Sequence, residues 1–262
     1  MTDFATSIEG IPIGYEVYGE GTPCLVFVHG WSCDRSYWER QLSHFARQHQ
    51  VVAIDLAGHG ESGADRTTWT MGAFGEDVVA VADKLGLDQI VLIGHSMGGP
   101  VIVEAARRMS QRVIALVGVD TFTDVARTRT PDQVEQSLAP LRANFLEETR
   151  RIVRNMFLPN SDPMLTEHIV ADMSSAPHHV AVGAWEEFGS NYQNLRTGLQ
   201  EVKAPIISIN SDYRPNNTDA AKNYGIEIRL MSGVGHFVMI EDAETFNQHL
   251  EEAIRSFVRL TQ

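Results

Sequence analysis

Residues 94–98 read GHSMG, and they place a serine between an apolar run and a segment with a helical pattern. The run 90–93 is typical of a buried strand, and the helical pattern begins near Gly98. Small residues two places before and after Ser96 let the backbone turn sharply, which exposes the serine hydroxyl. A serine is a good nucleophile only when it is exposed, deprotonated and served by an oxyanion site. The motif therefore predicts a nucleophile at Ser96, and a purely structural glycine-rich turn is the alternative.

Strand-like apolar runs alternate with helical segments along most of the chain. After a hairpin over 6–17, strands are expected at 24–28, 51–54, 90–93, 113–119, 205–210 and 226–231, and helices at 37–48, 71–85, 98–109 and 243–260. Continuous apolar runs between helices are typical of a parallel sheet that is covered on both faces. The sequence therefore predicts the α/β class with a mostly parallel central sheet.

The alternation stops between residues 121 and 199. Helical stretches are expected there near 131–145, 147–156, 164–173 and 178–188, separated by the turn-forming segments 158–163 and 174–177. We expect this region to be an all-helical insertion between two parts of the α/β core.

Composition narrows the range of partners. The chain has 262 residues, 43% of them hydrophobic, which suits one elaborated domain. Its net charge of −13 disfavours nucleic acid and anionic membranes, so the expected partner is a small-molecule substrate. No segment approaches the roughly 18 apolar residues of a membrane span, and residues 1–10 do not resemble a signal peptide. A cytoplasmic location is expected, and the oligomeric state stays open.

Cys24 and Cys33 are the chain's two cysteines, and their spacing is not that of a metal site. We expect both to be free thiols in a reducing compartment, with no metal and no cofactor. Cys33 is an alternative nucleophile, but it lacks the turn that presents Ser96.

Four motifs in order resemble the α/β-hydrolase family. They are HGW at 29–31 after the strand 24–28, DLAGHGES at 55–62, GHSMGG at 94–99 and GHF at 235–237. The resemblance covers nearly the whole chain. It implies the α/β-hydrolase fold, with residues 1–120 and 200–262 as the core and 121–199 as a helical cap over the active site.

The resemblance makes His236 the general base. Gly233 and Gly235 let its loop turn sharply after the last strand, and a near-neutral pKa suits a group that takes and returns a proton. A structural or surface role is the alternative, because the chain has 10 histidines.

The acidic member of the triad is ambiguous. The family usually places it about four residues after the strand 205–210, where this chain has Arg214, and Asp212 comes about two residues early. Asp120 ends the preceding strand, and a minority of the family takes the acid from that site. A partly buried carboxylate needs a partner, and His236 would be one. We favour Asp120 and keep Asp212 as the alternative.

The oxyanion site implied by the resemblance uses the backbone N–H groups of Trp31 and Met97. A mainly apolar substrate pocket is expected, although core packing is the alternative for each residue. Its candidates are His95, Phe122, Phe157, Trp185, Phe188 and Phe237.

These features favour a cofactor-free serine hydrolase that cleaves a small carboxylic ester, lactone or related acyl compound through an acyl-enzyme. On the same fold, the alternatives are a cofactor-independent dioxygenase, a C–C bond hydrolase or a ligand receptor. Met97 weakens the dioxygenase reading, since those enzymes tend to have histidine after the serine.

Overall fold

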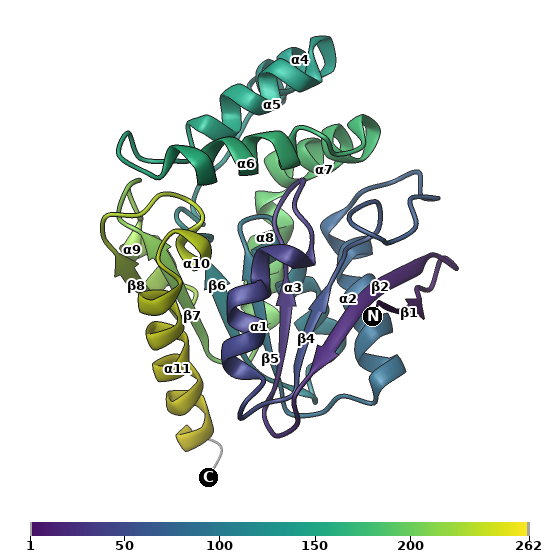
Figure 1. The fold of residues 1–262 in the computed structure, drawn as a ribbon, viewed down its shortest axis with the longest axis vertical. Coiled ribbons are helices and arrows are strands. Elements are labelled where there is room, and N and C mark those ends of the chain that lie inside the picture. The colour runs from purple at the N-terminus through teal and green to yellow at the C-terminus, as the bar shows by residue number, and fades with distance from the viewer. Residues whose placement is uncertain (1, 261–262) are drawn as a thin grey trace.

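A computed structural model describes residues 2–260 and shows one twisted sheet of eight strands within them (Figure 1). The strands are β1 (Asp3–Thr6), β2 (Pro12–Tyr18), β3 (Cys24–Val28), β4 (Val51–Ile54), β5 (Ile90–His95), β6 (Val113–Val119), β7 (Ile206–Ser211) and β8 (Ile226–Met231). Their order across the sheet is β1-β2-β4-β3-β5-β6-β7-β8. The pairs β1–β2 and β2–β4 are antiparallel and the others are parallel. The predicted α/β class with a mostly parallel sheet is confirmed.

The central strands are apolar along their whole length because both faces of the sheet are covered. Every residue of β3, β4 and β5 is buried. A sheet with one wet face would alternate apolar and polar side chains, and these strands do not. The core lies on both sides of β5, the strand that leads to Ser96.

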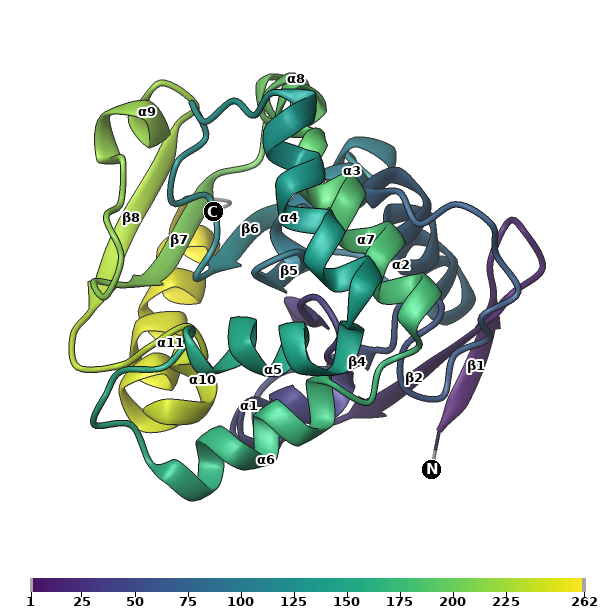
Figure 2. The same ribbon diagram turned by 90° about the horizontal axis from the view of Figure 1, so that it is seen from above.

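The helices form two layers on the sheet and one group above it (Figures 1 and 2). They are α1 (Glu39–Phe45), α2 (Met71–Leu85), α3 (Gly98–Arg108), α4 (Pro131–Ala143), α5 (Phe145–Arg154), α6 (Pro163–Met173), α7 (His178–Ser190), α8 (Tyr192–Glu201), α9 (Thr218–Lys222), α10 (Val238–Glu241) and α11 (Ala243–Leu260). A 3₁₀ turn, Arg35–Trp38, precedes α1. One face of the sheet carries α1 and α11, and the other carries α2, α3 and α8.

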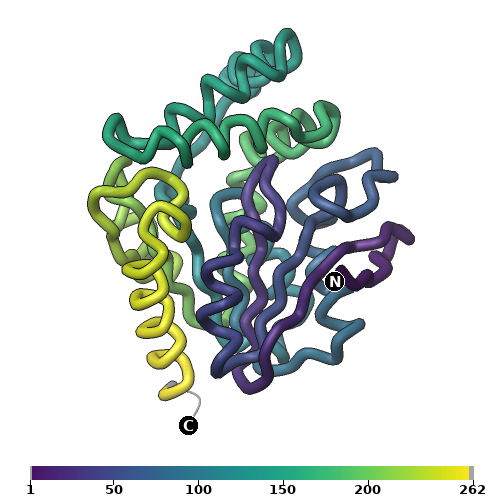
Figure 3. The backbone as a smooth tube through the Cα atoms, in the orientation of Figure 1, coloured from purple at the N-terminus to yellow at the C-terminus, as the bar shows by residue number. Residues whose placement is uncertain are grey.

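The helices of the insertion after β6 belong partly to the group above the sheet and partly to a layer on the sheet. Helices α4 to α7 lie beyond the carboxyl ends of the parallel strands, at the top of the trace in Figure 3. Helix α8, which the sequence pattern does not predict, packs against α3 beside the sheet. The segment above the sheet is therefore α4 to α7, and the chain has already returned to the helical layer of the core by residue 192.

Among residues 2–260, no helix combines the length and the apolar character that crossing a membrane requires.

Candidate active site

Ser96 occupies the turn between β5 and α3. Its φ is +51°, a left-handed conformation that is uncommon for a residue other than glycine. The Ser96 N–H donates to the Val119 carbonyl at 2.9 Å, which ties the turn to the end of the neighbouring strand β6. A Cβ at position 94 would lie 2.3 Å from the Gly98 carbonyl oxygen, and one at 98 would lie 2.6 Å from the Val28 carbonyl oxygen. Only glycine fits at these two positions, as the GHSMG spacing predicts.

Strained backbone conformations gather around this turn. In residues 2–260, five residues other than glycine have a positive φ, and four of them are Ser32, Ser96, Asp120 and Phe122. Each such residue costs on the order of 1–3 kcal/mol, and such residues cluster at active sites. They lie in the loops that follow β3, β5 and β6, at the carboxyl edge of the parallel sheet. This edge is where ligands bind in open α/β sheets.

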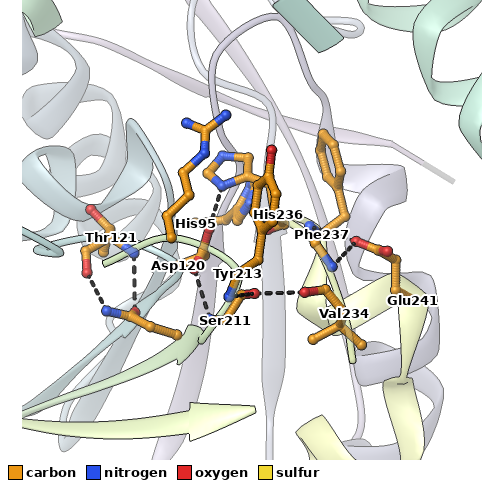
Figure 4. A network of polar contacts seen from close by, with 12 residues as sticks. His95, Asp120, Thr121, Ser211, Tyr213, Val234, His236, Phe237 and Glu241 are labelled. Atoms are coloured by element: carbon orange, nitrogen blue, oxygen red, sulfur yellow. Dashed lines mark hydrogen bonds and ion pairs between the residues drawn. The ribbon is translucent and has the colours of Figure 1, made fainter. Parts of the chain in front are cut away.

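His236 and Asp120 are joined by a hydrogen bond at the edge of the cavity that Ser96 also lines. Nδ1 of His236 donates to Oδ2 of Asp120 at 2.5 Å (Figure 4). The Asp120 side chain is 9% exposed and the His236 side chain 16%, so the contact is largely shielded from water. The other Asp120 oxygen, Oδ1, accepts the Ser211 N–H at 2.8 Å. Two directional bonds therefore hold the carboxylate with one oxygen toward the imidazole.

Asp212, the alternative acid, lies elsewhere. Its side chain is exposed, and its carboxylate accepts a hydrogen bond from the Ser232 hydroxyl. Asp120 reaches His236 because its φ of +43° bends the chain at the end of β6. The geometry thus pairs His236 with Asp120, the acid favoured on the sequence, and leaves Asp212 outside the site.

The loop that carries His236 is fixed by its backbone. The His236 N–H donates to the Met156 carbonyl at 2.8 Å. Oε1 of Glu241 accepts the N–H of Phe237 at 3.2 Å (Figure 4). It also accepts the N–H of Gly235 at 3.0 Å. Glu241 belongs to no motif, so the sequence gives no sign of this role.

A buried network of hydrogen bonds holds the backbone that follows Asp120. Asn210 on β7 accepts from the Thr121 N–H at 3.2 Å and donates to the Thr121 carbonyl at 3.0 Å. Its Oδ1 also accepts from the Ser208 hydroxyl at 2.7 Å. These contacts hold the strained segment that follows Asp120. Ser208 and Asn210 are polar residues within a buried strand, which is the one sequence signal that could have revealed them.

Two backbone N–H groups next to Ser96 in sequence or space, those of Met97 and Trp31, are the expected oxyanion donors. Among the described residues, neither the Trp31 N–H nor the Met97 N–H has a protein acceptor, and both residues are buried. Buried N–H groups are nearly always paired, so two free ones beside a nucleophile are suited to an oxyanion. The Trp31 indole has a separate role, because its Nε1 donates to the Ala181 carbonyl of α7 at 2.7 Å.

A cavity of about 340 Å³ opens above Ser96 and His236. Three of the predicted pocket residues, Phe122, Trp185 and Phe188, line it. The predicted apolar character is also supplied by residues that carried no motif signal, namely Pro100, Val125, Met156 and Leu195. Arg127, Arg129 and Arg214 line it as well, although no motif in the sequence marks them as pocket residues.

The other three predicted pocket residues, His95, Phe157 and Phe237, do not line this cavity. Nε2 of His95 donates to the His236 carbonyl at 3.0 Å, and burial lowers the pKa of His95 well below its ordinary value. His95 is therefore a neutral support beneath the His236 loop. Phe157 stacks on the fully buried Phe237 with ring centroids 5.2 Å apart. The two rings pack behind His236 because the short turn into α10 directs Phe237 into the core.

The cysteines are poor nucleophile candidates. Both are buried, and burial raises the pKa of Cys24 to about 12 and that of Cys33 well above its ordinary value. Reactive cysteines need a lowered pKa and access to solvent. No group of three or more His, Cys, Asp or Glu side chains in the described part of the chain is placed to hold a metal ion.

Comparison with known proteins identifies the family of this chain. A sequence model described as "Alpha/beta hydrolase family" matches residues 25–249. The chain belongs to this family. The match includes all four motifs and the loops that carry Ser96, Asp120 and His236.

Individual relatives are distant. The chain is 23% identical to 3-oxoadipate enol-lactonase 2 of Acinetobacter baylyi over 95% of both sequences. It is 27% identical to the dihydrolipoyllysine-residue acetyltransferase component of the acetoin cleaving system of Pseudomonas putida, over 92% of this chain and 66% of that protein. The chain thus spans just under two thirds of that relative's length.

The fold is shared with solved structures. A thermophilic esterase from Thermogutta terrifontis superposes with a TM-score of 0.83 at 22% identity, covering 98% of this chain and 99% of that one. This likeness confirms the α/β-hydrolase fold.

Proposed function

We propose that this protein is a serine hydrolase of small carboxylic esters, lactones or related acyl compounds, with Ser96, His236 and Asp120 as its triad. The observation that carries the proposal is the 2.5 Å contact between His236 and Asp120 in the cavity that Ser96 lines. Similarity to an enol-lactonase along the whole chain supports the ester and lactone class.

In this proposal Ser96 Oγ attacks the acyl carbon while Nε2 of His236 takes its proton. Nδ1 keeps its proton toward Asp120, which fixes the tautomer and stabilises the imidazolium that forms. The N–H groups of Trp31 and Met97 bind the oxyanion. His236 then protonates the leaving oxygen, and water hydrolyses the acyl-enzyme by the same route in reverse order.

Helices α4 to α7 act as the cap in this proposal. The cap contacts the core at defined points, since Tyr37 Oη donates to the Asp172 carboxylate of α6 at 2.7 Å and Trp31 bonds to α7. Trp185 and Phe188 of α7 form its wall of the cavity. The cap would therefore limit the size of the acyl group and exclude water from the reacting atoms.

The test compares Ser96→Ala with Cys33→Ala. Wild type should hydrolyse 4-nitrophenyl acetate and be labelled by a fluorophosphonate probe, and it should react equally well without oxygen. Ser96→Ala should lose both properties, and Cys33→Ala, which also removes one buried nucleophilic atom, should keep both. Labelling or turnover that persists in Ser96→Ala would disprove the proposed nucleophile. A requirement for oxygen would instead favour the dioxygenase alternative.

A further inference from the structure

Three arginines line the cavity that contains Ser96 and His236. Arg127 and Arg129 lie in the loop between β6 and α4, and Arg214 lies in the loop after β7. Two separate parts of the chain therefore bring guanidinium groups to one cavity. Arg127 and Arg214 are exposed and Arg129 is half-buried, which places the positive charge toward the cavity's outer part.

These arginines have no carboxylate partner among the described residues. Arg129 donates to the Gln133 carbonyl at 2.9 Å, and Arg214 donates to the Asn155 carbonyl at 3.0 Å and lies 5.2 Å from the Tyr213 ring centre. Elsewhere, eleven arginines each form an ion pair with an acidic side chain. Of the seven other arginines in residues 2–260, three line this one cavity.

The carboxylates of the same cavity are already engaged. Asp120 accepts from His236 and from the Ser211 N–H. Asp124 accepts from the Asn217 side-chain amide at 2.9 Å. The cavity thus carries three guanidinium groups and two carboxylates, and a bound anion would complete the charge balance. A planar guanidinium binds a carboxylate through two parallel hydrogen bonds, which makes arginine well suited to this task.

The rest of the cavity wall suits an apolar segment between the two ends of such a ligand. Phe122, Val125 and Leu195 are apolar and lie in the same cavity as Ser96 and the arginines. We propose that the substrate is an acyl compound with an apolar spacer and a second, free carboxylate, which Arg127, Arg129 and Arg214 bind while Ser96 attacks the ester or lactone carbonyl. This inference rests on the proposed hydrolase function and specifies its substrate class.

The first experiment compares two esters of nearly the same shape. The 4-nitrophenyl monoester of glutaric acid carries the free carboxylate, and 4-nitrophenyl 5-methylhexanoate has an isopropyl group in its place. Wild type should show a higher kcat/KM for the charged ester, mainly through a lower KM. The triple variant Arg127→Gln, Arg129→Gln, Arg214→Gln should lose about tenfold or more of that preference, in line with the strength of charge-assisted bonds.

Arg150→Gln is the matched control. It also removes one positive charge from the region above the sheet, but Arg150 pairs with Glu147 on α5 and lies outside the cavity. Its preference should equal that of wild type. Equal kcat/KM values for the two esters in wild type, or an unchanged preference in the triple variant, would overturn the inference.

Calorimetry on Ser96→Ala separates this inference from the proposed function. Monomethyl glutarate should bind this variant, and adding the three Arg→Gln changes should weaken binding about tenfold or more. If wild type hydrolyses neither ester but this binding pattern holds, the hydrolase function fails and the anion site stands. If both esters are hydrolysed but monomethyl glutarate binds no better than methyl 5-methylhexanoate, the anion site fails alone.

Discussion

Replacing Asp120 with asparagine should reduce catalysis far more than its small change in shape suggests. Oδ1 of Asp120 accepts the Ser211 N–H at 2.8 Å, and asparagine keeps that oxygen. The side-chain NH₂ then takes the place of Oδ2 and faces Nδ1 of His236. Because NH₂ is a donor, Nδ1 has to accept, and the single imidazole proton moves to Nε2. That tautomer cannot accept the proton of Ser96.

The analogous change in a serine protease triad lowers kcat by about 10⁴, and we expect a similar loss here. This corresponds to about 5 kcal/mol of transition-state stabilisation, since each tenfold change is worth about 1.4 kcal/mol. The measurement is kcat/KM for 4-nitrophenyl acetate, together with urea unfolding to show that the variant still folds.

Asp212→Asn is the matched control for this change. Asp212 is exposed and bonds to the Ser232 hydroxyl, so this variant should keep nearly all of its activity. A loss of less than about tenfold in Asp120→Asn, or a larger loss in Asp212→Asn, would refute the reasoning about the tautomer.

Three further predictions concern stability and the cap. Burial lowers the pKa of His29 to about 4 and that of His59 to about 3, whereas both protonate near 6.5 when unfolded. The unfolded chain therefore binds more protons than the folded chain below pH 6.5. The free energy of unfolding, measured in urea, should fall by on the order of 2 kcal/mol per histidine between pH 7 and pH 5. A free energy of unfolding that stays constant over this range would contradict the prediction. Arg66→Met leaves the fully buried carboxylate of Asp77 without its main charged partner and should cost about 3–5 kcal/mol in urea unfolding. Trp185→Ala should shift the preference among acetate to octanoate esters toward longer acyl groups. Each additional methylene that fits should improve transition-state binding by about 1–3 kcal/mol. A chain-length profile equal to that of wild type would argue against a cavity wall formed by α7.

The sheet could be predicted from the sequence because buried parallel strands are continuous apolar runs. The expected strands 24–28, 51–54, 113–119 and 226–231 have the observed bounds. Helix α8 was not predicted because its segment, YQNLRTGLQE, is mostly polar and forms a single face against α3. The order of polar and apolar residues within this segment does not reveal that it packs against α3.

The site could be predicted only where a motif fixes the backbone. The turn at Ser96 has room only for glycine at positions 94 and 98, and the GHSMG spacing shows this requirement directly. Asp120 was ambiguous because its approach to His236 depends on a positive φ that aspartate only occasionally adopts. The arginines at the cavity lie in loops, where no periodicity indicates which way a side chain faces. Arg214 stands where the family usually has its acid, and that position can hold a cation because Asp120 supplies the contact to His236.

The Trp31 ring gives the molecule an optical probe of the position of α7. Its centroid lies 4.7 Å from that of Trp185 on α7, with the ring planes inclined by 59°. Two indoles held this close and at a fixed angle couple their electronic transitions, which produces circular dichroism bands that an isolated tryptophan lacks. Any movement of α7 away from the sheet has to separate the rings and break the bond from Trp31 to the Ala181 carbonyl. The circular dichroism of the unlabelled wild-type protein can therefore report any displacement of α7 from the sheet.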